Sequence, residues 1–348
     1  MKRLVILLVT CFMMCSRAMS AVVINETNFP DENFRKWLLT HFYYSADSLL
    51  TESEIANIKF VYVSEKGIKN LKGIEYLTGM TYLDCSNNQL TELDITKNKA
   101  LAYVDCSHNQ LTSIKASGSL VLGELKCSDN LLTLLDVSKC RELEGLYCER
   151  NQLTALNVSE CEEIQRISCD NNQLTTLDVT ECPAMEHLYI SSNQLTAIDL
   201  SKNEKLVSLD CSDNQLASLD ISMNKNIYWL AFNQNRIAGA KMDALLESLP
   251  TVSNHNTMNV LSVENEQNVM SKTQVAAAQA KGWTPLYYDG NKWQEYEGST
   301  PTNIDSICNL GVMNYGEEAA VYDLQGRLLQ REPKHGIYIK DGKKIAGK

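Results

Sequence analysis

Residues 81–111 read TYLDCSNNQLTELDITKNKALAYVDCSHNQL, a stretch in which one pattern occurs twice with a spacing of 21 residues. The full pattern is L-x-x-L-x-C-S-x-N-Q-L-T-x-L-D-V-S-x-N/C-x-x, and it runs through eight repeats without an insertion. We number its places 1 to 21, starting at Met80. Position 6 is then filled by Cys85, Cys106, Cys127, Cys148, Cys169, Ile190, Cys211 and Phe232. A further repeat of 22 residues precedes these eight and carries Val61, Val63, Ile68, Leu71, Ile74 and Leu77 at its apolar places.

A period of this length, with leucines and an asparagine at fixed places, is typical of a leucine-rich repeat. Each coil of such a protein contributes one short parallel strand and buries its apolar side only by stacking on its neighbours. Leu83 and Cys85 alternate with polar residues, so positions 4 and 6 should face inward and positions 3, 5, 7 and 8 outward. The sequence therefore predicts a leucine-rich-repeat solenoid with a curved parallel β-sheet, short 21-residue coils, a helical N-terminal cap and a small β-rich C-terminal tail.

Position 9 is an asparagine in all eight repeats. A carboxamide has two donor hydrogens and an acceptor, so a stacked column of them can satisfy backbone groups where each strand bends away. We interpret the column as scaffold. It consists of Asn88, Asn109, Asn130, Asn151, Asn172, Asn193, Asn214 and Asn235.

Ten cysteines follow residue 20, and an exported protein would ordinarily pair them as disulfides. Stacked strands, however, hold equivalent side chains parallel at about 4.8 Å, whereas a disulfide needs converging Cβ atoms about 3.8 Å apart. We expect the six strand cysteines to be buried thiols. Cys140, Cys161 and Cys182 form a second column behind the coil, where one disulfide stays an open alternative. No C-x-x-C pair predicts zinc, and we expect neither a metal nor a cofactor.

Five segments are predicted along the chain. Residues 1–20 carry Lys2 and Arg3 near their start, continue with an apolar run and end in a small-residue cleavage site, which is typical of a signal peptide. We expect a helical cap over residues 21–58, repeats over 59–235, a C-terminal cap over 236–298, and a linker with a β-rich tail over 299–348. No transmembrane segment is expected in the mature chain.

The cysteine-bearing repeats resemble those of the internalin family, of the internalin J type, over residues 67–235. The resemblance implies a secreted or surface-exposed binding protein that uses the concave face of the sheet. Residues 25–58 resemble the helical cap of related proteins, which often contains an EF-hand-like loop. Aligned with such a loop, this chain offers only Asp47 and Glu54 as strong calcium ligands, and a helical hairpin with Thr51 and Glu54 as a capping box is the preferred interpretation.

The phrases VYDLQGR and GIYIKDGKK, within residues 321–344, resemble the C-terminal sorting domain of the type IX secretion route. The resemblance implies export to the outer membrane or cell surface of a Gram-negative bacterium. A small β-rich domain without a sorting role is the alternative. The segment from residue 236 carries KMDALLESLP, an amphipathic helix ended by Pro250, which we expect to cover the open end of the core.

The charge balance limits the partners. The chain has 32 Lys and Arg against 43 Asp and Glu, and removal of residues 1–20 would take away three basic residues and no acidic one. Nucleic acids and anionic membranes are therefore disfavoured. No nucleophile, base and orienting group converge in the pattern, so we expect a binding protein and not an enzyme.

The repeat numbering lists the outward side chains of the sheet. Tyr, Trp and Arg dominate the energetics of protein interfaces, and these types gather in the middle repeats. We predict a ligand-binding patch, here called the middle patch, of Tyr147, Arg150, Arg166, His187 and Tyr189, flanked by Tyr103 and Trp229. The expected function is binding of another protein, as an adhesin or interaction module, with carbohydrate binding as the alternative.

Overall fold

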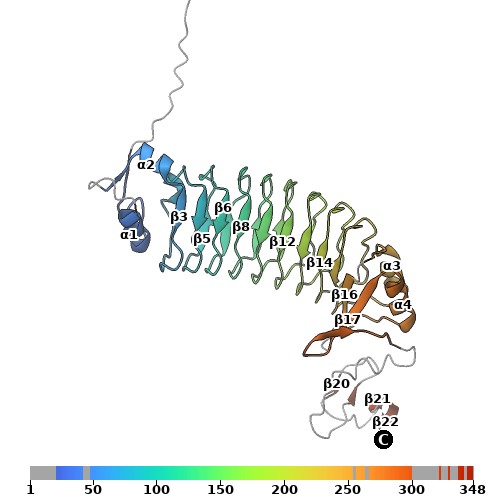
Figure 1. Cartoon of the computed structure of the whole chain (residues 1–348). Helices are drawn as coiled ribbons and strands as arrows, with labels where there is room; N and C mark the ends of the chain where they lie inside the picture. Colours follow the sequence, from blue (N-terminus) through green and yellow to red (C-terminus); the bar gives the residue numbers. More distant parts are fainter. Residues whose placement is uncertain are drawn as a thin grey trace, which may run out of the picture.

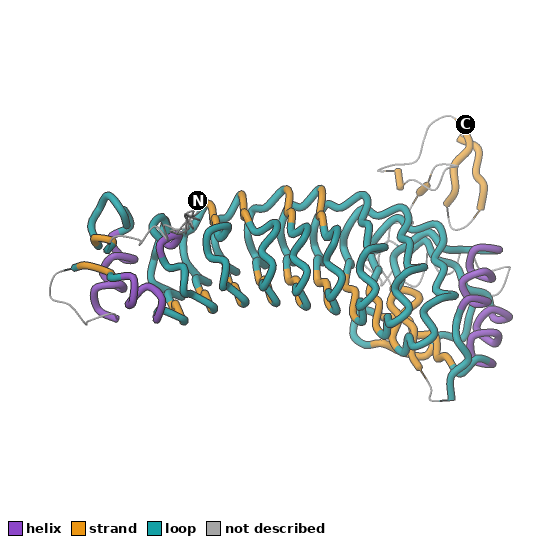
Figure 2. Tube along the Cα trace, turned by 90° about the horizontal axis from the view of Figure 1, so that it is seen from above, coloured by secondary structure: helices purple, strands orange, loops and turns teal. Residues whose placement is uncertain are grey.

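The computed structural model describes residues 21–41, 48–253, 256–262 and 266–299, together with the backbone of four short strands within 321–347. Coils stack along one axis in the order of the sequence, so that each coil contacts the one before and the one after (Figures 1 and 2). This is the predicted leucine-rich-repeat solenoid. Among the described residues, none of the helices combines the length and the apolar character needed to span a membrane.

One side of the coils forms a continuous parallel sheet in which each residue pairs with the residue 21 positions later, as Gly145 does with Arg166. The regular strands are three residues long and place position 4 at their centre. They are β4 (Tyr82–Asp84), β6 (Tyr103–Asp105), β8 (Glu124–Lys126), β10 (Gly145–Tyr147), β12 (Arg166–Ser168), β13 (His187–Tyr189), β14 (Ser208–Asp210) and β15 (Trp229–Ala231), preceded by β3 (Phe60–Tyr62). We call this the main sheet.

The opposite side of the coils has only fragments of sheet. These are the parallel pairs β5 (Glu92–Asp94) with β7 (Ser113–Lys115), and β9 (Leu134–Asp136) with β11 (Ala155–Asn157). In the first coil, the segment after β3 contains a 3-10 turn, η1 (Ile74–Tyr76). The regular coils thus carry ordered strands on one side and mostly turns on the other.

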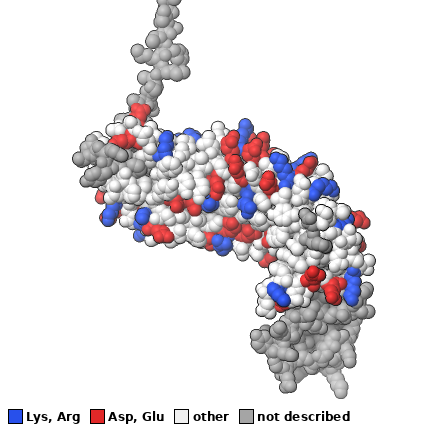
Figure 3. Space-filling view, in the orientation of Figure 1, with Lys and Arg blue, Asp and Glu red and all other residues white. Residues whose placement is uncertain are grey.

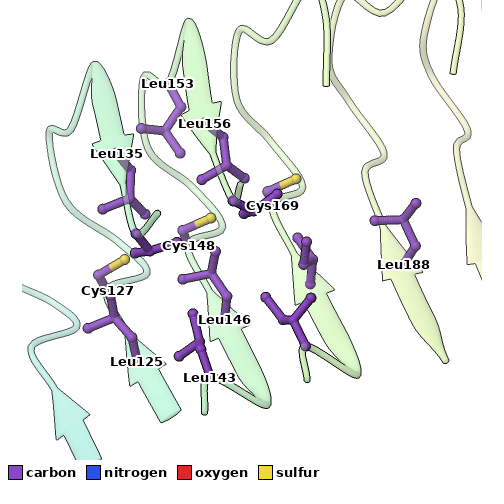
Figure 4. Close-up of a cluster of buried hydrophobic side chains, with 14 of the residues drawn as sticks. Leu125, Cys127, Leu135, Leu143, Leu146, Cys148, Leu153, Leu156, Cys169 and Leu188 are labelled. Atoms are coloured by element: carbon purple, nitrogen blue, oxygen red, sulfur yellow. The ribbon is translucent and has the colours of Figure 1, made fainter. Parts of the chain in front are cut away.

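The predicted alternation is confirmed in the core. The residues at positions 4 and 6 of all eight regular coils are buried, and in Figure 4 Leu125, Cys127, Leu146 and Cys148 point into the space between the two sides of the coils. All nine cysteines of the described residues are free and buried. The strand cysteines are therefore buried thiols, as predicted.

The asparagine column joins each coil to the next. Asn151 Nδ2 donates to the carbonyls of Cys127 in the preceding coil (3.0 Å) and of Cys148 in its own coil (3.1 Å), while its Oδ1 accepts from the Leu132 amide (3.0 Å). The same contacts recur from Asn109 to Asn235. Because these backbone groups lie where the strand ends and the chain turns, the carboxamide replaces the hydrogen bonds that the sheet no longer supplies.

The second cysteine column performs a similar task. Cys161 Sγ donates to the Val137 carbonyl, 24 residues earlier, at 3.2 Å, and Cys140 contacts Ala116 in the same way at 3.3 Å. In the coils where asparagine takes this place, Asn203 Nδ2 donates to the Val179 carbonyl at 2.9 Å. The open alternative of a disulfide is not realised, because these thiols are free and point at backbone carbonyls.

The N-terminal end of the core is covered by α1 (Glu32–His41) and α2 (Glu52–Asn57), with the two-stranded pair β1 (Val22–Val23) and β2 (Leu49–Leu50). Phe34 and Leu38 of α1 are fully buried against the first coil. Thr51 caps α2, and Glu54 closes the capping box by accepting from the Thr51 amide at 2.7 Å. The predicted helical cap and the capping box of Thr51 and Glu54 are confirmed, whereas β2 stands between the two helices of the expected hairpin. Asp47 and the rest of the calcium-loop alignment before Ser48 lie outside the described residues.

The sheet extends further than the 21-residue pattern indicates. Trp229 of β15 pairs with Thr257 of β16 (Asn256–Ser262), and β16 pairs in parallel with β17 (Trp283–Tyr288). These two coils are longer and carry helices α3 (Ala240–Ser248) and α4 (Lys272–Ala280) behind the sheet, and β18 (Trp293–Glu295) ends it in antiparallel fashion. The helix at KMDALLES, expected to cover the open end of the core, therefore belongs to a further coil, and Asn268 continues the asparagine column by donating to the Phe232 carbonyl.

The last strands form a separate antiparallel sheet in the order β20-β19-β21-β22. Their bounds are β19 (Val321–Tyr322), β20 (Leu328–Leu329), β21 (Gly336–Lys340) and β22 (Lys343–Gly347). The tail is thus β-rich in its backbone, whereas its sorting role stays a prediction.

Candidate protein-binding face

The outward side of the main sheet presents two columns of side chains, at positions 3 and 5. Parallel pairing in strict register places equivalent residues on neighbouring strands about 4.8 Å apart. Position 8 follows each strand in the left-handed conformation, with φ between 50° and 57° from Asn87 to Gln234, and this turns the chain away from the sheet. Positions 3 and 5 are therefore the residues that a partner lying on the sheet would meet.

Four residues of the predicted middle patch and its flank are brought together on β12, β13 and β15. The Arg166 guanidinium carbon lies 5.3 Å from the centre of the Tyr189 ring, which is the range of a cation–π contact. The ring of His187 lies 6.3 Å from that of Tyr189, and Trp229 lies at 6.3 Å on the other side. The Tyr189 ring thus contacts Arg166 from the neighbouring β12, His187 from its own strand and Trp229 from β15, which lies beyond β14.

Lys126 connects the other part of the patch to its flank. Its ammonium lies 5.2 Å from the centre of the Tyr103 ring and 5.6 Å from that of Tyr147. It also pairs with Glu124 at 2.9 Å and donates to the Tyr103 hydroxyl at 3.1 Å. The hydrogen bond to Glu124 is the largest cause that raises the pKa of Lys126, so this lysine stays charged.

Gly145 makes room for the Tyr147 ring. A Cβ atom at this position would lie 3.2 Å from Cε2 of Tyr147 and 3.5 Å from the Glu124 side chain. The aromatic ring therefore lies across the glycine on its own strand. This holds Tyr147 close to the sheet.

Arg150 is placed differently from the rest of the middle patch. It occupies position 8, beyond the strand, and forms a bidentate pair with Asp129 at 2.6 and 2.7 Å. His108 faces the same carboxylate from the other side, 3.6 Å away. The contacts with Arg150 are the main reason that the pKa of Asp129 is lowered. Arg150 therefore belongs to a charged row along the turns.

His187 lies in a partly buried place on the sheet. Burial first, and the nearby positive charge of Arg166 second, lower the pKa of its imidazole. Its Nδ1 is buried without a hydrogen-bond partner within the described part of the chain. His187 is thus neutral at physiological pH.

Three further aromatic rings lie on the same face and were not included in the predicted patch. Phe60, Tyr62 and Tyr82 occupy the first two strands, and Tyr82 stacks on Tyr103 with ring centres 4.3 Å apart and planes at 5°. Their signal was present in the sequence, because Phe60 and Tyr62 fill positions 3 and 5 of the 22-residue repeat. The irregular length of that repeat kept Phe60 and Tyr62 out of the alignment of outward positions, whereas Tyr82 was aligned at position 3 but not included in the patch.

The described residues offer no group of three or more His, Cys, Asp or Glu side chains placed to hold a metal ion. The thiols of the strand cysteines also have low reactivity. Burial raises the pKa of Cys85 and Cys211 far above the ordinary value, so their reactive thiolate form is suppressed.

Comparisons with known proteins agree with this architecture. No family model matches the chain. The sequence is 34% identical to internalin J from Listeria monocytogenes serotype 4b (strain F2365) over 70 residues. These residues make up 20% of this chain and 8% of that protein. The structure is similar to that of the functional domain of internalin J from Listeria monocytogenes, described as including a cysteine ladder, with a TM-score of 0.52 and 27% identity over 72% of this chain and 61% of the other. A second similar structure is that of internalin C2 from Listeria monocytogenes strain 4b F2365, with a TM-score of 0.47 and 22% identity. The match covers 60% of this chain and 94% of the other.

Proposed function

We propose that the main sheet of this chain, a leucine-rich-repeat solenoid whose repeats are homologous to those of internalin J, binds another protein through the middle patch. The observation that carries the proposal is the arrangement of Arg166, His187 and Trp229 around the Tyr189 ring. None of these four side chains is needed to close the coil, because the core is filled by positions 4 and 6. Their presence on the open side is therefore best explained by contact with a ligand.

The geometry favours binding because these side chains are already held in place. Ordering a flexible side chain at an interface costs roughly 0.5–1.5 kcal/mol, and rings fixed by their neighbours avoid part of that cost. Ser208 adds to this order, since its hydroxyl lies 3.3 Å from that of Tyr189. Tyr, Trp and Arg on a preorganised surface are the types that act as anchors in protein interfaces.

The test is a double variant, Tyr147→Ala with Tyr189→Ala. The mature protein is screened against a panel of cell-surface protein ectodomains and against a glycan array, and the affinity for each ligand found is measured by titration. We expect a protein ligand whose affinity falls at least tenfold in the double variant. Leu134→Ala, which removes an exposed apolar side chain from β9 behind the sheet, is the matched control and should bind as the wild type does.

Two results of that screen contradict the proposal. An unchanged affinity in the double variant removes the middle patch as the site. Binding to glycans with no protein ligand favours the alternative, a carbohydrate-binding surface, for which the half-exposed tyrosine rings supply stacking surfaces. Export is also part of the proposal, because residues 1–20 have the pattern of a signal peptide.

A further inference from the structure

Four aromatic rings and two carboxylates form a small grid at the N-terminal end of the main sheet, which we call the N-terminal platform. Register pairing sets Phe60 beside Tyr82 and Tyr62 beside Asp84. The next strand adds Tyr103 beside Tyr82 and Asp105 beside Asp84. One column of the grid is therefore three rings, and the other is one ring followed by two carboxylates.

The first strand of the platform is unusually exposed for its composition. The side chains of Phe60 and Tyr62 are 58% and 54% exposed, although the central residue of the same strand, Val61, is fully buried. The two rings are nearly parallel, with planes at 4° and centres 6.3 Å apart. Large aromatic groups left exposed on the strand are not required by the core, and a contiguous exposed patch of this kind is typical of an interaction surface.

The rings behind them are fixed. Tyr82 and Tyr103 stack face to face, with ring centres 4.3 Å apart, and Lys126 donates to the Tyr103 hydroxyl. Burial, followed by the contact with Tyr103, raises the pKa of Tyr82 to about 12, so Tyr82 is uncharged at neutral pH. Since the faces of these two rings are occupied, the free ring surface of the platform lies on Phe60 and Tyr62.

The carboxylates beside them have an unused oxygen. Asp84 Oδ1 accepts from the amide and hydroxyl of Ser86, at 3.1 and 2.7 Å, and Asp105 Oδ1 does the same with Ser107. Among the described residues, no hydrogen bond is made to Oδ2 of either aspartate. The nearest cation on the face, Lys126, is already paired with Glu124. The platform therefore presents open ring faces next to Asp84, whose Oδ2 accepts no hydrogen bond within the described residues.

The outward side of the whole main sheet also has a net negative charge. Positions 3, 5, 7 and 8 of the eight regular repeats carry eight Asp or Glu and three Lys or Arg. In Figure 3, acidic side chains are interspersed with basic ones over the solenoid, with the larger acidic areas over its middle. A ligand of opposite charge is thus attracted to this side of the molecule.

We propose that the N-terminal platform binds an arginine side chain in an extended basic segment of the protein partner, with the guanidinium stacked on Tyr62 and paired with Asp84. A guanidinium is planar, stacks on aromatic faces and forms forked hydrogen bonds to carboxylates, whereas an ammonium is a compact and strongly hydrated charge. The ring and the carboxylate lie on neighbouring strands, about 4.8 Å apart, so one guanidinium reaches both. The platform deepens the proposed function and rests on it, since it assumes that the main sheet binds protein.

The test uses two peptides of equal charge, acetyl-(Gly-Arg)4-amide and acetyl-(Gly-Lys)4-amide, each with a fluorescent label and titrated with the full chain at low salt. The wild type should bind the arginine peptide at least threefold more tightly. Tyr62→Leu removes the ring without changing the charge, and Asp84→Asn removes the charge without changing the size. Each should weaken binding of the arginine peptide about fivefold and reduce the preference for arginine.

Glu204→Gln, at an exposed place behind the sheet, is the control for net charge and should change binding less than twofold. Because Tyr62 is more than half exposed, its replacement should leave the circular dichroism spectrum and the melting temperature unchanged. Equal binding of the two peptides, or unchanged binding in Tyr62→Leu, overturns the proposal and leaves only general acidity. The Tyr147→Ala, Tyr189→Ala double variant should still bind the arginine peptide, so failure of the middle patch and failure of the platform are told apart.

Discussion

Single asparagine residues that recur every 21 positions join the coils of this molecule through side-chain hydrogen bonds. Each asparagine of the position 9 column satisfies backbone groups in two coils, as Asn151 does with the carbonyls of Cys127 and Cys148 and the amide of Leu132. A buried donor or acceptor left without a partner costs roughly 1–3 kcal/mol. The column therefore acts as a second set of inter-coil hydrogen bonds beside the sheet.

Asn151→Ala should accordingly lower the free energy of unfolding by about 3 kcal/mol, because one substitution leaves several buried backbone groups unpaired. The measurement is urea denaturation followed by circular dichroism. Gln152→Ala, one residue later and exposed, is the control and should change stability by less than about 0.5 kcal/mol. Similar effects from the two variants would show that the column is not structural.

His187 gives the molecule a pH dependence whose sign is set by its surroundings. Its pKa is lowered in the folded protein by burial and by Arg166, so the fold favours the neutral ring. This contribution to stability is complete above the pKa of the unfolded chain, about 6.5, and is lost as the pH falls through the lower folded value. NMR titration of the imidazole should give a pKa below 6.5, and Arg166→Gln should raise it. An unchanged pKa of His187 in Arg166→Gln would show that the charge of Arg166 does not act on the imidazole.

The elements show where sequence reasoning succeeds and where it stops. Leu83 and Cys85 were assigned to the interior from alternation alone, since a regular period fixes which side chains share an environment. Strands β16 and β17 were not predicted because their coils are longer and break the 21-residue spacing, although Asn268 still fills the asparagine column. Phe60 escaped the predicted site for the same reason.

Strand alternation placed most side chains of the predicted patch on the outward face, but not Arg150, and their role in binding stays a prediction. Positions 3 and 5 follow from strand alternation, which is why Arg166, Tyr189 and Trp229 meet on one face. Arg150 at position 8 follows the strand, where the left-handed backbone turns it toward Asp129. Alternation alone does not show where a strand ends.

The capping box at the start of α2 can be tested against the alternative interpretation of this segment, a calcium-binding loop. Glu54 accepts from both the amide and the hydroxyl of Thr51, so its carboxylate is engaged in the capping box. Thr51→Ala should lower stability by about 1 kcal/mol, the usual value of an N-cap. Millimolar calcium should leave the melting temperature of the wild type unchanged. A rise of several degrees with calcium, reversed by a chelator, would instead indicate a metal-binding loop.

The whole molecule is a one-dimensional stack, and its stability should vary along the axis. A central strand such as β12 is paired on both sides, whereas the main sheet ends at β3 and β18, each of which has a single neighbour. In a repeat protein the stability is close to a sum of coil and interface contributions, so end coils open more easily than central ones.

Amide hydrogen exchange should therefore show the slowest rates in β10 and β12, with faster exchange toward β3 and fastest exchange in β18, which has only three residues and pairs antiparallel to β17 alone. The rates are measured by mass spectrometry on peptic fragments at neutral pH. In Asn151→Ala, protection should fall most in β8 and β10, on either side of the broken contact, and least in β16 and β17. Uniform loss of protection over all strands would contradict this expectation, because it would mean that the solenoid opens as a single cooperative unit.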